Sequence, residues 1–208
     1  SFPYIFELKS LTWLDLSTND ITYIPPSHVA NFSQPFTLVL SNTPLTCIDP
    51  EVFNKAPNLF KIIWHSPIVQ IPRFPMCDTN SHNNLQELTF SGPKIFLTFE
   101  CKIFINFPSL TTLQIYSSPL TELPDLMGAY NLQSLVLCCN KIRTSPNDTY
   151  FAQAKNLKEI RLENNLIPSI PNCILKHMGN LEKLKLQDNK IAQIWNYSCI
   201  PEINSLKY

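Results

Sequence analysis

Histidine and cysteine are the residues of this chain with the widest chemical range, because they serve as nucleophiles, general bases and metal ligands. The 208 residues include four His and seven Cys, but no HExxH or CxxC motif that would hold zinc. The three glycines cannot form the phosphate-binding motifs GxGxxG or GxxxxGK[ST]. We therefore expect no metal and no cofactor.

The equal numbers of positive and negative residues indicate which kinds of partner the chain can bind. Sixteen Lys and Arg balance sixteen Asp and Glu, and 44% of the residues are hydrophobic. This composition predicts a folded protein with a core, and it argues against recognition of nucleic acid by charge alone. No apolar run reaches the roughly 20 residues that span a bilayer. A membrane anchor is therefore expected only in segments outside this chain.

A repeat of 22 to 26 residues runs through the sequence. Its clearest copy is Leu11-x-x-Leu14-x-Leu16-x-x-Asn19-x-Ile21, which returns from Leu157 and Leu181. We number each repeat from its first residue as phase 1. The eight repeats start near residues 11, 35, 59, 85, 110, 132, 157 and 181. We expect one array over residues 1–208.

The apolar residues at phases 4 and 6 predict one short strand per repeat, because strand side chains alternate between two faces. Another large apolar residue stands six positions before almost every start, which predicts a second buried position on the return segment. Each repeat is too small to bury its own apolar face, so neighbours must stack. The sequence predicts an α/β solenoid whose strands form one parallel sheet.

The pattern LxxLxLxxNxLxxIPxxxF resembles that of extracellular leucine-rich-repeat proteins. The resemblance implies a horseshoe with a parallel concave β-sheet and a mostly irregular or 3-10 convex side. In that family, the Asn at phase 9 hydrogen-bonds the backbone of neighbouring repeats. Four repeats match, at Asn19, Asn140, Asn165 and Asn189. The second to fifth repeats carry Thr43, Pro67, Pro93 and Ser118 instead. We predict an interrupted ladder and altered curvature there.

Four cysteines occupy matching phases in adjacent repeats. Stacked strands lie about 4.8 Å apart, which suits the Cα separation of a disulfide. We therefore predict the pairs Cys77–Cys101 and Cys173–Cys199, with buried free thiols as the alternative. Cys47, Cys138 and Cys139 remain without an assigned partner.

Three N-x-[S/T] sequons begin at Asn31, Asn147 and Asn196, all on return segments. Glycans there would leave the concave face clear, and they indicate an extracellular chain, either secreted or the ectodomain of a cell-surface membrane protein. Related ectodomains usually carry Cys-rich caps, which this chain lacks. We expect a fragment of a longer receptor, truncated at both ends.

A Cys–His nucleophile can be proposed for any protein that holds both residues. Cys138 and Cys139 stand at phases 7 and 8 of the sixth repeat, and His65 stands at phase 7 of the third. Three strand spacings of about 4.8 Å separate these repeats, beyond hydrogen-bond reach. We expect no enzyme, so the function must come from recognition.

The expected recognition surface is the concave face, where phases 2, 3, 5, 7 and 8 point outward. Its candidate ligand-binding residues are Trp13, Phe36, Val39, Phe60, Ile63, Tyr116, Val136, Arg161 and Lys185. Apolar side chains gathered on an exposed face usually indicate a partner. Alternatively they stabilise the sheet by cross-strand packing, or a glycan or the rest of the receptor covers them. Arg161 and Lys185 would favour an acidic or phosphate-bearing group.

The phrase Leu14-Asp15-Leu16-Ser17, the variable repeat lengths and the interrupted Asn ladder resemble a Toll-like receptor ectodomain. The resemblance implies innate-immune pattern recognition of a protein, lipid or glycan ligand, with signalling by pairing of two identical or different receptors. The alternatives are an adhesion, neuronal or hormone-receptor ectodomain, and a secreted leucine-rich-repeat protein that binds another protein.

Overall fold

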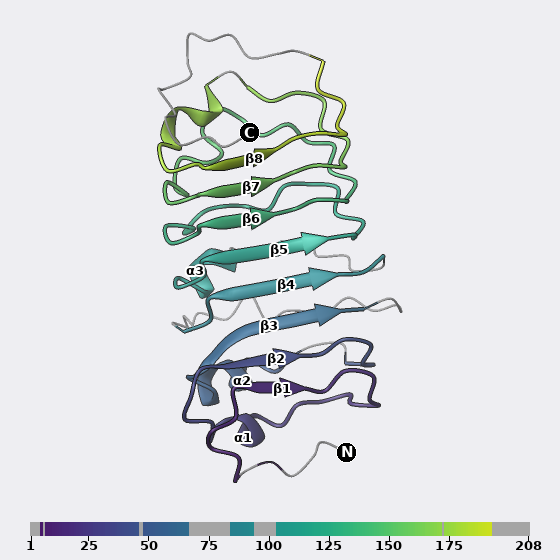
Figure 1. The fold of residues 1–208 in the computed structure, drawn as a ribbon, viewed down its shortest axis with the longest axis vertical. Coiled ribbons are helices and arrows are strands. Elements are labelled where there is room, and N and C mark those ends of the chain that lie inside the picture. The colour runs from purple at the N-terminus through teal and green to yellow at the C-terminus, as the bar shows by residue number, and fades with distance from the viewer. Residues whose placement is uncertain are drawn as a thin grey trace.

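The structure, a computed structural model, describes residues 5, 7–45, 48–66, 84–93, 103–171 and 173–192. Eight parallel strands form one sheet in which each strand pairs with the next along the chain (Figure 1). The strands are β1 (Trp13–Asp15), β2 (Phe36–Val39), β3 (Leu59–His65), β4 (Glu87–Ser91), β5 (Thr112–Tyr116), β6 (Ser134–Val136), β7 (Glu159–Arg161) and β8 (Lys183–Lys185). The predicted leucine-rich-repeat solenoid with one parallel sheet is confirmed.

The core lies between the sheet and the return segments. Phases 4 and 6 supply the inner face of the sheet, for example Leu88 and Phe90, both fully buried. The return segments contribute the second apolar position predicted from the repeat, which is buried wherever the structure describes it. Its members are Ile5, Val29, Phe53, Phe104, Leu126, Phe151 and Leu175. Thr79 and Ile200, at the same position, lie outside the described residues.

Where the structure describes the return segments, their helices are short. These are α1 (Pro26–Val29), α2 (Pro50–Lys55), α3 (Ile103–Asn106) and the 3-10 helix η1 (Ile174–His177). Helix α2 begins where the Asp49 side chain accepts a hydrogen bond from the Glu51 N–H at 2.9 Å, with Pro50 in the first turn. The predicted convex side is therefore confirmed, with three short α-helices added.

The second repeat starts one residue later than its leucine spacing suggests. In six repeats, the backbone N–H at phase 1 closes a turn by donating to the carbonyl three residues earlier, as Leu59 does to Ala56 at 3.0 Å. Pro35 has no N–H and cannot make this bond. Pro35 is exposed, and Phe36 takes the buried position with its ring edge against Phe32, at a centroid distance of 4.7 Å. Placing Phe36 on the concave face was wrong.

The turn that ends each strand takes two forms. In six repeats the residue at phase 8 is a non-glycine with φ between 53° and 59°, as at Cys139 and Asn164. Repeats three and four lack this turn, and β3 and β4 continue to phase 7. Gly92 holds phase 8 of repeat four with φ 145°, and a Cβ there would lie 1.9 Å from the Ser66 carbonyl oxygen. Strand β5 also reaches phase 7, at Tyr116, although its repeat has the turn at Ser117. The missing turn is therefore not the sole cause of a longer strand, and the altered curvature stays a prediction.

The phase-9 Asn ladder links the last three repeats. The Asn165 amide nitrogen donates to the Leu137 carbonyl of the preceding repeat at 2.8 Å, and its oxygen accepts from the Ile142 N–H at 3.0 Å. Asn140 and Asn189 repeat this arrangement. Asn19 donates only within its own repeat, and Thr43 keeps a single bond to Leu40 at 3.2 Å. The ladder is therefore confirmed for the last three repeats, and Pro67 lies outside the described residues.

A second Asn ladder, which the repeat analysis missed, lies at the entry to the strands. Each member directly precedes phase 1 and donates its side-chain N–H to a backbone carbonyl of the preceding repeat. The five members are Asn58, Asn84, Asn131, Asn156 and Asn180. Its signal in the sequence is the dipeptide Asn-Leu at five of the eight starts. This ladder includes repeats three and four, where the first ladder is absent among the described residues.

Candidate functional site

The concave face carries a discontinuous apolar surface. Trp13 on β1 is 54% exposed, while Phe60, Ile63 and Tyr116 are half-buried. Val39 and Val136 retain only 7% and 5% exposure, yet neither belongs to the core cluster. These two valines are therefore covered, and the accessible apolar groups lie over β1, β3 and β5.

Phe60 reaches this face through an irregularity in the pairing of β2 with β3. Phe36 and Thr37 are consecutive in β2, but they oppose Leu59 and Lys61 in β3. Phe60 is therefore an extra residue, and such a bulge re-aims a side chain relative to the regular alternation. The phase count placed Phe60 on the concave face without indicating this cause.

Ion pairs cross the concave face between adjacent strands. Lys61 on β3 contacts Glu87 on β4, and Lys183 on β8 contacts Glu159 on β7, each at 2.6 Å. Burial alone would raise the pKa of Glu159, but hydrogen bonds from Lys183 and Ser134 and the nearby positive charges lower it overall. The first pair lies on repeats three and four, and the second neutralises one positive and one negative charge on the last two repeats.

Arg161 is not the free cation that the sequence suggests. Its guanidinium donates to Glu163 Oε1 through Nε at 2.8 Å, and Glu163 is only 4% exposed. The hydrogen bond to Glu163 raises the pKa of Arg161. The charge of Arg161 is therefore neutralised by Glu163. Of the two cations predicted to favour an acidic group, only Lys185 has no ion pair within the described part of the chain.

The phase-7 side chains form a row on consecutive strands. His65 Nδ1 lies 2.5 Å from Ser91 Oγ, and the His65 ring centroid lies 5.9 Å from that of Tyr116. Burial lowers the pKa of His65. Cys138 follows Tyr116 in the next repeat, so β4 and β5 stand between the histidine and this thiol. Burial, with Cys139 nearby, raises the pKa of Cys138 to about 11, which keeps it protonated at neutral pH.

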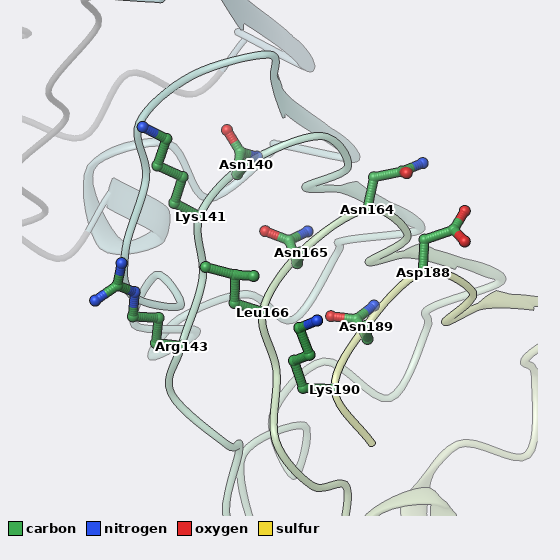
Figure 2. A pocket seen from close by; sticks show the side chains of 9 residues that line it. All are labelled: Asn140, Lys141, Arg143, Asn164, Asn165, Leu166, Asp188, Asn189 and Lys190. Atoms are coloured by element: carbon green, nitrogen blue, oxygen red, sulfur yellow. The ribbon is translucent and has the colours of Figure 1, made fainter. Parts of the chain in front are cut away.

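Beyond the sheet, a pocket of about 730 Å³ opens where the strands of repeats six to eight turn into their return segments (Figure 2). It is lined by Asn140, Lys141, Arg143, Asn164, Asn165, Leu166, Asp188, Asn189 and Lys190. We call it the loop-edge pocket. Its lining residues follow the strands and were not among the predicted site residues, although phase 10 of the last three repeats holds Lys141, Leu166 and Lys190 in succession.

The covalent predictions are only partly covered by the described residues. Cys173 is disulfide-bonded, whereas Cys138 and Cys139 are free. Cys47, Cys77, Cys101, Cys199 and Asn196 lie outside the described residues, so both pairings stay predictions. Asn31 and Asn147 are exposed and belong to return segments, where a glycan meets no strand. None of the described helices is both long and apolar enough to cross a membrane.

Two family models match the chain. One, described as "Leucine rich repeat", covers residues 130–191, and another, "Leucine Rich Repeat", covers residues 10–32. Together with the repeat motif and the parallel sheet, these matches define a leucine-rich-repeat protein.

Several curated relatives are receptors by name. "Leucine-rich repeat-containing G-protein coupled receptor 5" of Rattus norvegicus is 37% identical over 92 residues, or 44% of this chain and 10% of the receptor. "Probable glycoprotein hormone G-protein coupled receptor" of Anthopleura elegantissima is 24% identical over 204 residues, or 96% of this chain and 21% of that protein. The chain thus spans about a tenth to a fifth of the length of these relatives.

Solved structures confirm the fold. A leucine-rich-repeat protein of Leptospira interrogans superposes with a TM-score of 0.68 at 26% identity, over 92% of this chain and 46% of that one. The structure titled as a TLR13–ssRNA13 complex matches with a TM-score of 0.69 at 20% identity, over 96% of this chain and 32% of that one. The Toll-like resemblance is therefore one among several leucine-rich-repeat neighbours.

Proposed function

We propose that this chain is the extracellular ligand-recognition part of a leucine-rich-repeat receptor and that it binds a protein without catalysing a reaction. The observation that carries the proposal is the group of accessible apolar side chains over β1, β3 and β5, on the face away from the core. Trp13, Phe60, Ile63 and Tyr116 form this group. Large apolar side chains ringed by polar ones are typical of the centre of a protein interface.

Two charge features support a protein ligand over a small anion. The ion pairs Lys61–Glu87 and Glu159–Lys183 supply a polar surround of both signs, and Arg161 is already bound to Glu163. A face with balanced, paired charges around an apolar patch has little to attract a phosphate, but it matches the core and rim of an interface. Receptor pairing on binding belongs to the same proposal.

Among the receptor types, sequence similarity supports a G-protein-coupled receptor, since one relative of that name is 37% identical over part of the chain and another, named as a hormone receptor, is 24% identical over most of it. A Toll-like receptor is the second candidate, supported by the motif phrase and by likeness of fold at 20% identity. The parent transcript distinguishes them: we expect seven membrane helices downstream. A cytoplasmic TIR domain would establish the second candidate instead, and a stop codon would indicate a secreted protein.

The binding face is tested by interferometry of the 208-residue chain against purified secreted proteins. For a protein that binds, we expect Ile63→Asp to weaken affinity at least about tenfold, because a charge enters an apolar contact. Tyr130→Asp, an exposed return-segment position, is the matched control and should change affinity less than about twofold. Circular dichroism confirms that each variant is folded, and Ile63→Thr is the milder replacement. Equal affinity of the Ile63 variants and the wild type would move the site off the concave face.

A further inference from the structure

The loop-edge pocket has positive charge that the described protein leaves unpaired. Lys141, Arg143 and Lys190 are exposed, and within the described part of the chain none of them forms an ion pair or a side-chain hydrogen bond. Asp188 is the single acidic residue among the lining residues. Three cations facing one hollow attract an anionic ligand and raise its local concentration.

The backbone fixes the spacing of these charges. Lys141, Leu166 and Lys190 occupy phase 10 of successive repeats, and each N–H donates to a carbonyl of the preceding repeat at 2.9–3.0 Å. Coils that stack at about 4.8 Å place the Cα atoms of the two lysines roughly 10 Å apart. Figure 2 shows Leu166 between Lys141 and Arg143 on one side and Lys190 on the other.

The floor of the pocket is rigid and already satisfied. The amides of Asn140, Asn165 and Asn189 bond the backbone on both sides, as the phase-9 ladder requires. They have no reason to turn toward a ligand, so recognition falls to the long side chains around them. A floor that does not rearrange lowers the entropy lost on binding.

We infer that the loop-edge pocket binds an acidic peptide segment in extended conformation, with Asp or Glu at positions i and i+4 and an apolar residue at i+2. Side chains two residues apart in an extended chain point the same way, and four residues span roughly 13 Å. The Lys141 and Lys190 side chains are long and flexible, so their ammonium groups can reach two carboxylates at that separation. The planar guanidinium of Arg143 adds a second donor group for the first carboxylate. The apolar residue at i+2 rests on half-buried Leu166.

A peptide fits these residues better than a sulfated glycan does. None of the nine lining residues is aromatic, so a sugar ring would find no flat apolar partner. A glycan would also desolvate its hydroxyl groups against Leu166 without a compensating hydrogen bond. Because phase 10 lies beyond the end of the strand, this site is separate from the concave face, and its test is independent of the proposed function.

The first test measures fluorescence anisotropy of the fluorescein-labelled peptide Gly-Glu-Ser-Leu-Ser-Glu-Gly with the 208-residue protein. We expect saturable binding that weakens as NaCl rises from about 50 mM to about 300 mM, because exposed charges are screened over about a Debye length. Replacing both Glu with Gln in the peptide should weaken binding at least about tenfold. Replacing its Leu with Ser should weaken binding about threefold.

The second test locates the binding site. The double variant Lys141→Glu with Lys190→Glu should bind the acidic peptide at least about tenfold more weakly than the wild type. The milder double variant Lys141→Gln with Lys190→Gln should lose less affinity. Lys155→Glu is the matched control, since Lys155 is exposed on a return segment outside the pocket, and it should change affinity less than about twofold. Equal binding of the Gln-substituted peptide, or unchanged binding by the lysine variants, would overturn the proposal. So would a heparin-derived tetrasaccharide that binds through these lysines while the peptide does not bind.

Discussion

Repeats three and four solve the problem of ending a strand differently from repeats six to eight. In the later repeats a left-handed residue at phase 8 turns the chain, and the Asn at phase 9 bonds backbone groups of two repeats. In the central repeats β3 and β4 run on to His65 and Ser91, and the backbone at Gly92 packs directly on Ser66. Where the amide side chain is missing, close approach of the backbones replaces it.

The interior changes together with the turn. Phase 6 holds Trp64 and Phe90 in the central repeats, against Leu137 and Leu162 in the later ones, and all four are nearly or completely buried. The larger rings fill the core of repeats whose strands are longer. The Asn ladder at strand entry continues through both regions, for example at Asn58 and Asn156. One array thus tolerates two kinds of strand end because its strand entries remain alike.

The largest loss of stability is expected from a substitution at Gly92, where the backbones of repeats three and four pack closely. Gly92→Ala places a Cβ 1.9 Å from the Ser66 carbonyl oxygen, at a φ of 145° that side chains rarely adopt. Since the opposing atom belongs to the backbone, it cannot move aside locally. We expect the free energy of unfolding to fall by about 4 kcal/mol or more. Urea denaturation followed by circular dichroism measures this change.

Gly179→Ala is the matched control, because a Cβ at Gly179 meets no atom within 4 Å. Its unfolding free energy should stay within about 0.5 kcal/mol of the wild type. A comparable loss in both variants would show that the close approach at Gly92 is not what limits the substitution.

The second largest loss of stability is expected from a substitution in the phase-9 Asn ladder of the later repeats. Asn165→Ala removes the bonds to the Leu137 carbonyl and from the Ile142 N–H. The Leu137 carbonyl keeps the bond from Asn140 Nδ2 at 2.9 Å, but the Ile142 N–H is left buried without its partner. We expect a loss of about 2–3 kcal/mol. Asn19→Ala, whose exposed side chain bonds only its own repeat at 3.1 and 3.2 Å, should lose about 0.5–1 kcal/mol in the same urea experiment. Equal losses of unfolding free energy would mean that side-chain bonds between repeats stabilise the fold no more than bonds within a single repeat.

A smaller loss of stability is expected from substitutions in the Asn ladder at strand entry, which the two regions share. Asn58→Ala removes one part-buried bond to the Phe32 carbonyl at 2.8 Å in the central region. Asn156→Ala removes the corresponding bond to Tyr130 at 2.7 Å in the later region. The ladder at strand entry has the same bond in both regions, but the Asn156 bond is exposed. We therefore expect Asn58→Ala to lose about 1 kcal/mol and Asn156→Ala to lose slightly less. A loss confined to one of them would show that strand entry, too, differs between the regions.

Much of this fold follows from the order of apolar residues. Leucines two residues apart, such as Leu14 and Leu16, predict the strands, and Asn165 predicts the ladder by its type and position. The start at Phe36 required the further fact that Pro35 lacks the N–H that closes the turn, which a count of apolar residues does not include. Arg161 and Glu163 stand two residues apart at phases 5 and 7, both on the outward face, so the two-residue alternation was sufficient to predict this pair, although the phase count alone did not join them.

The candidate site was less predictable than the fold for a physical reason. Alternation along a strand assigns each side chain to a face, but it does not say how far neighbouring strands cover it, as Val39 and Val136 show. The loop-edge pocket depends on turns that stack by backbone hydrogen bonds such as Leu166 to Ile142. Such turns have no two-residue period, so their side chains cannot be placed from hydrophobic pattern alone.

The smallest expected effect concerns His65, at the end of the lengthened β3. Burial lowers its pKa in the folded protein below the ordinary value of 6.5. The unfolded chain therefore binds more protons as the pH falls through 6.5, and the stability contributed by neutral His65 is lost toward acid. Because the ring is only partly buried, solvent reduces the effect to less than about 0.5 kcal/mol. Urea denaturation of the wild type and His65→Gln at about pH 7.5 and about pH 5.5 isolates it, since the other titrating groups are common to both proteins. The wild type should lose more stability on acidification than His65→Gln. A greater loss in the variant would mean that the neighbours of the ring, Ser91 and Tyr116, stabilise the charged form instead.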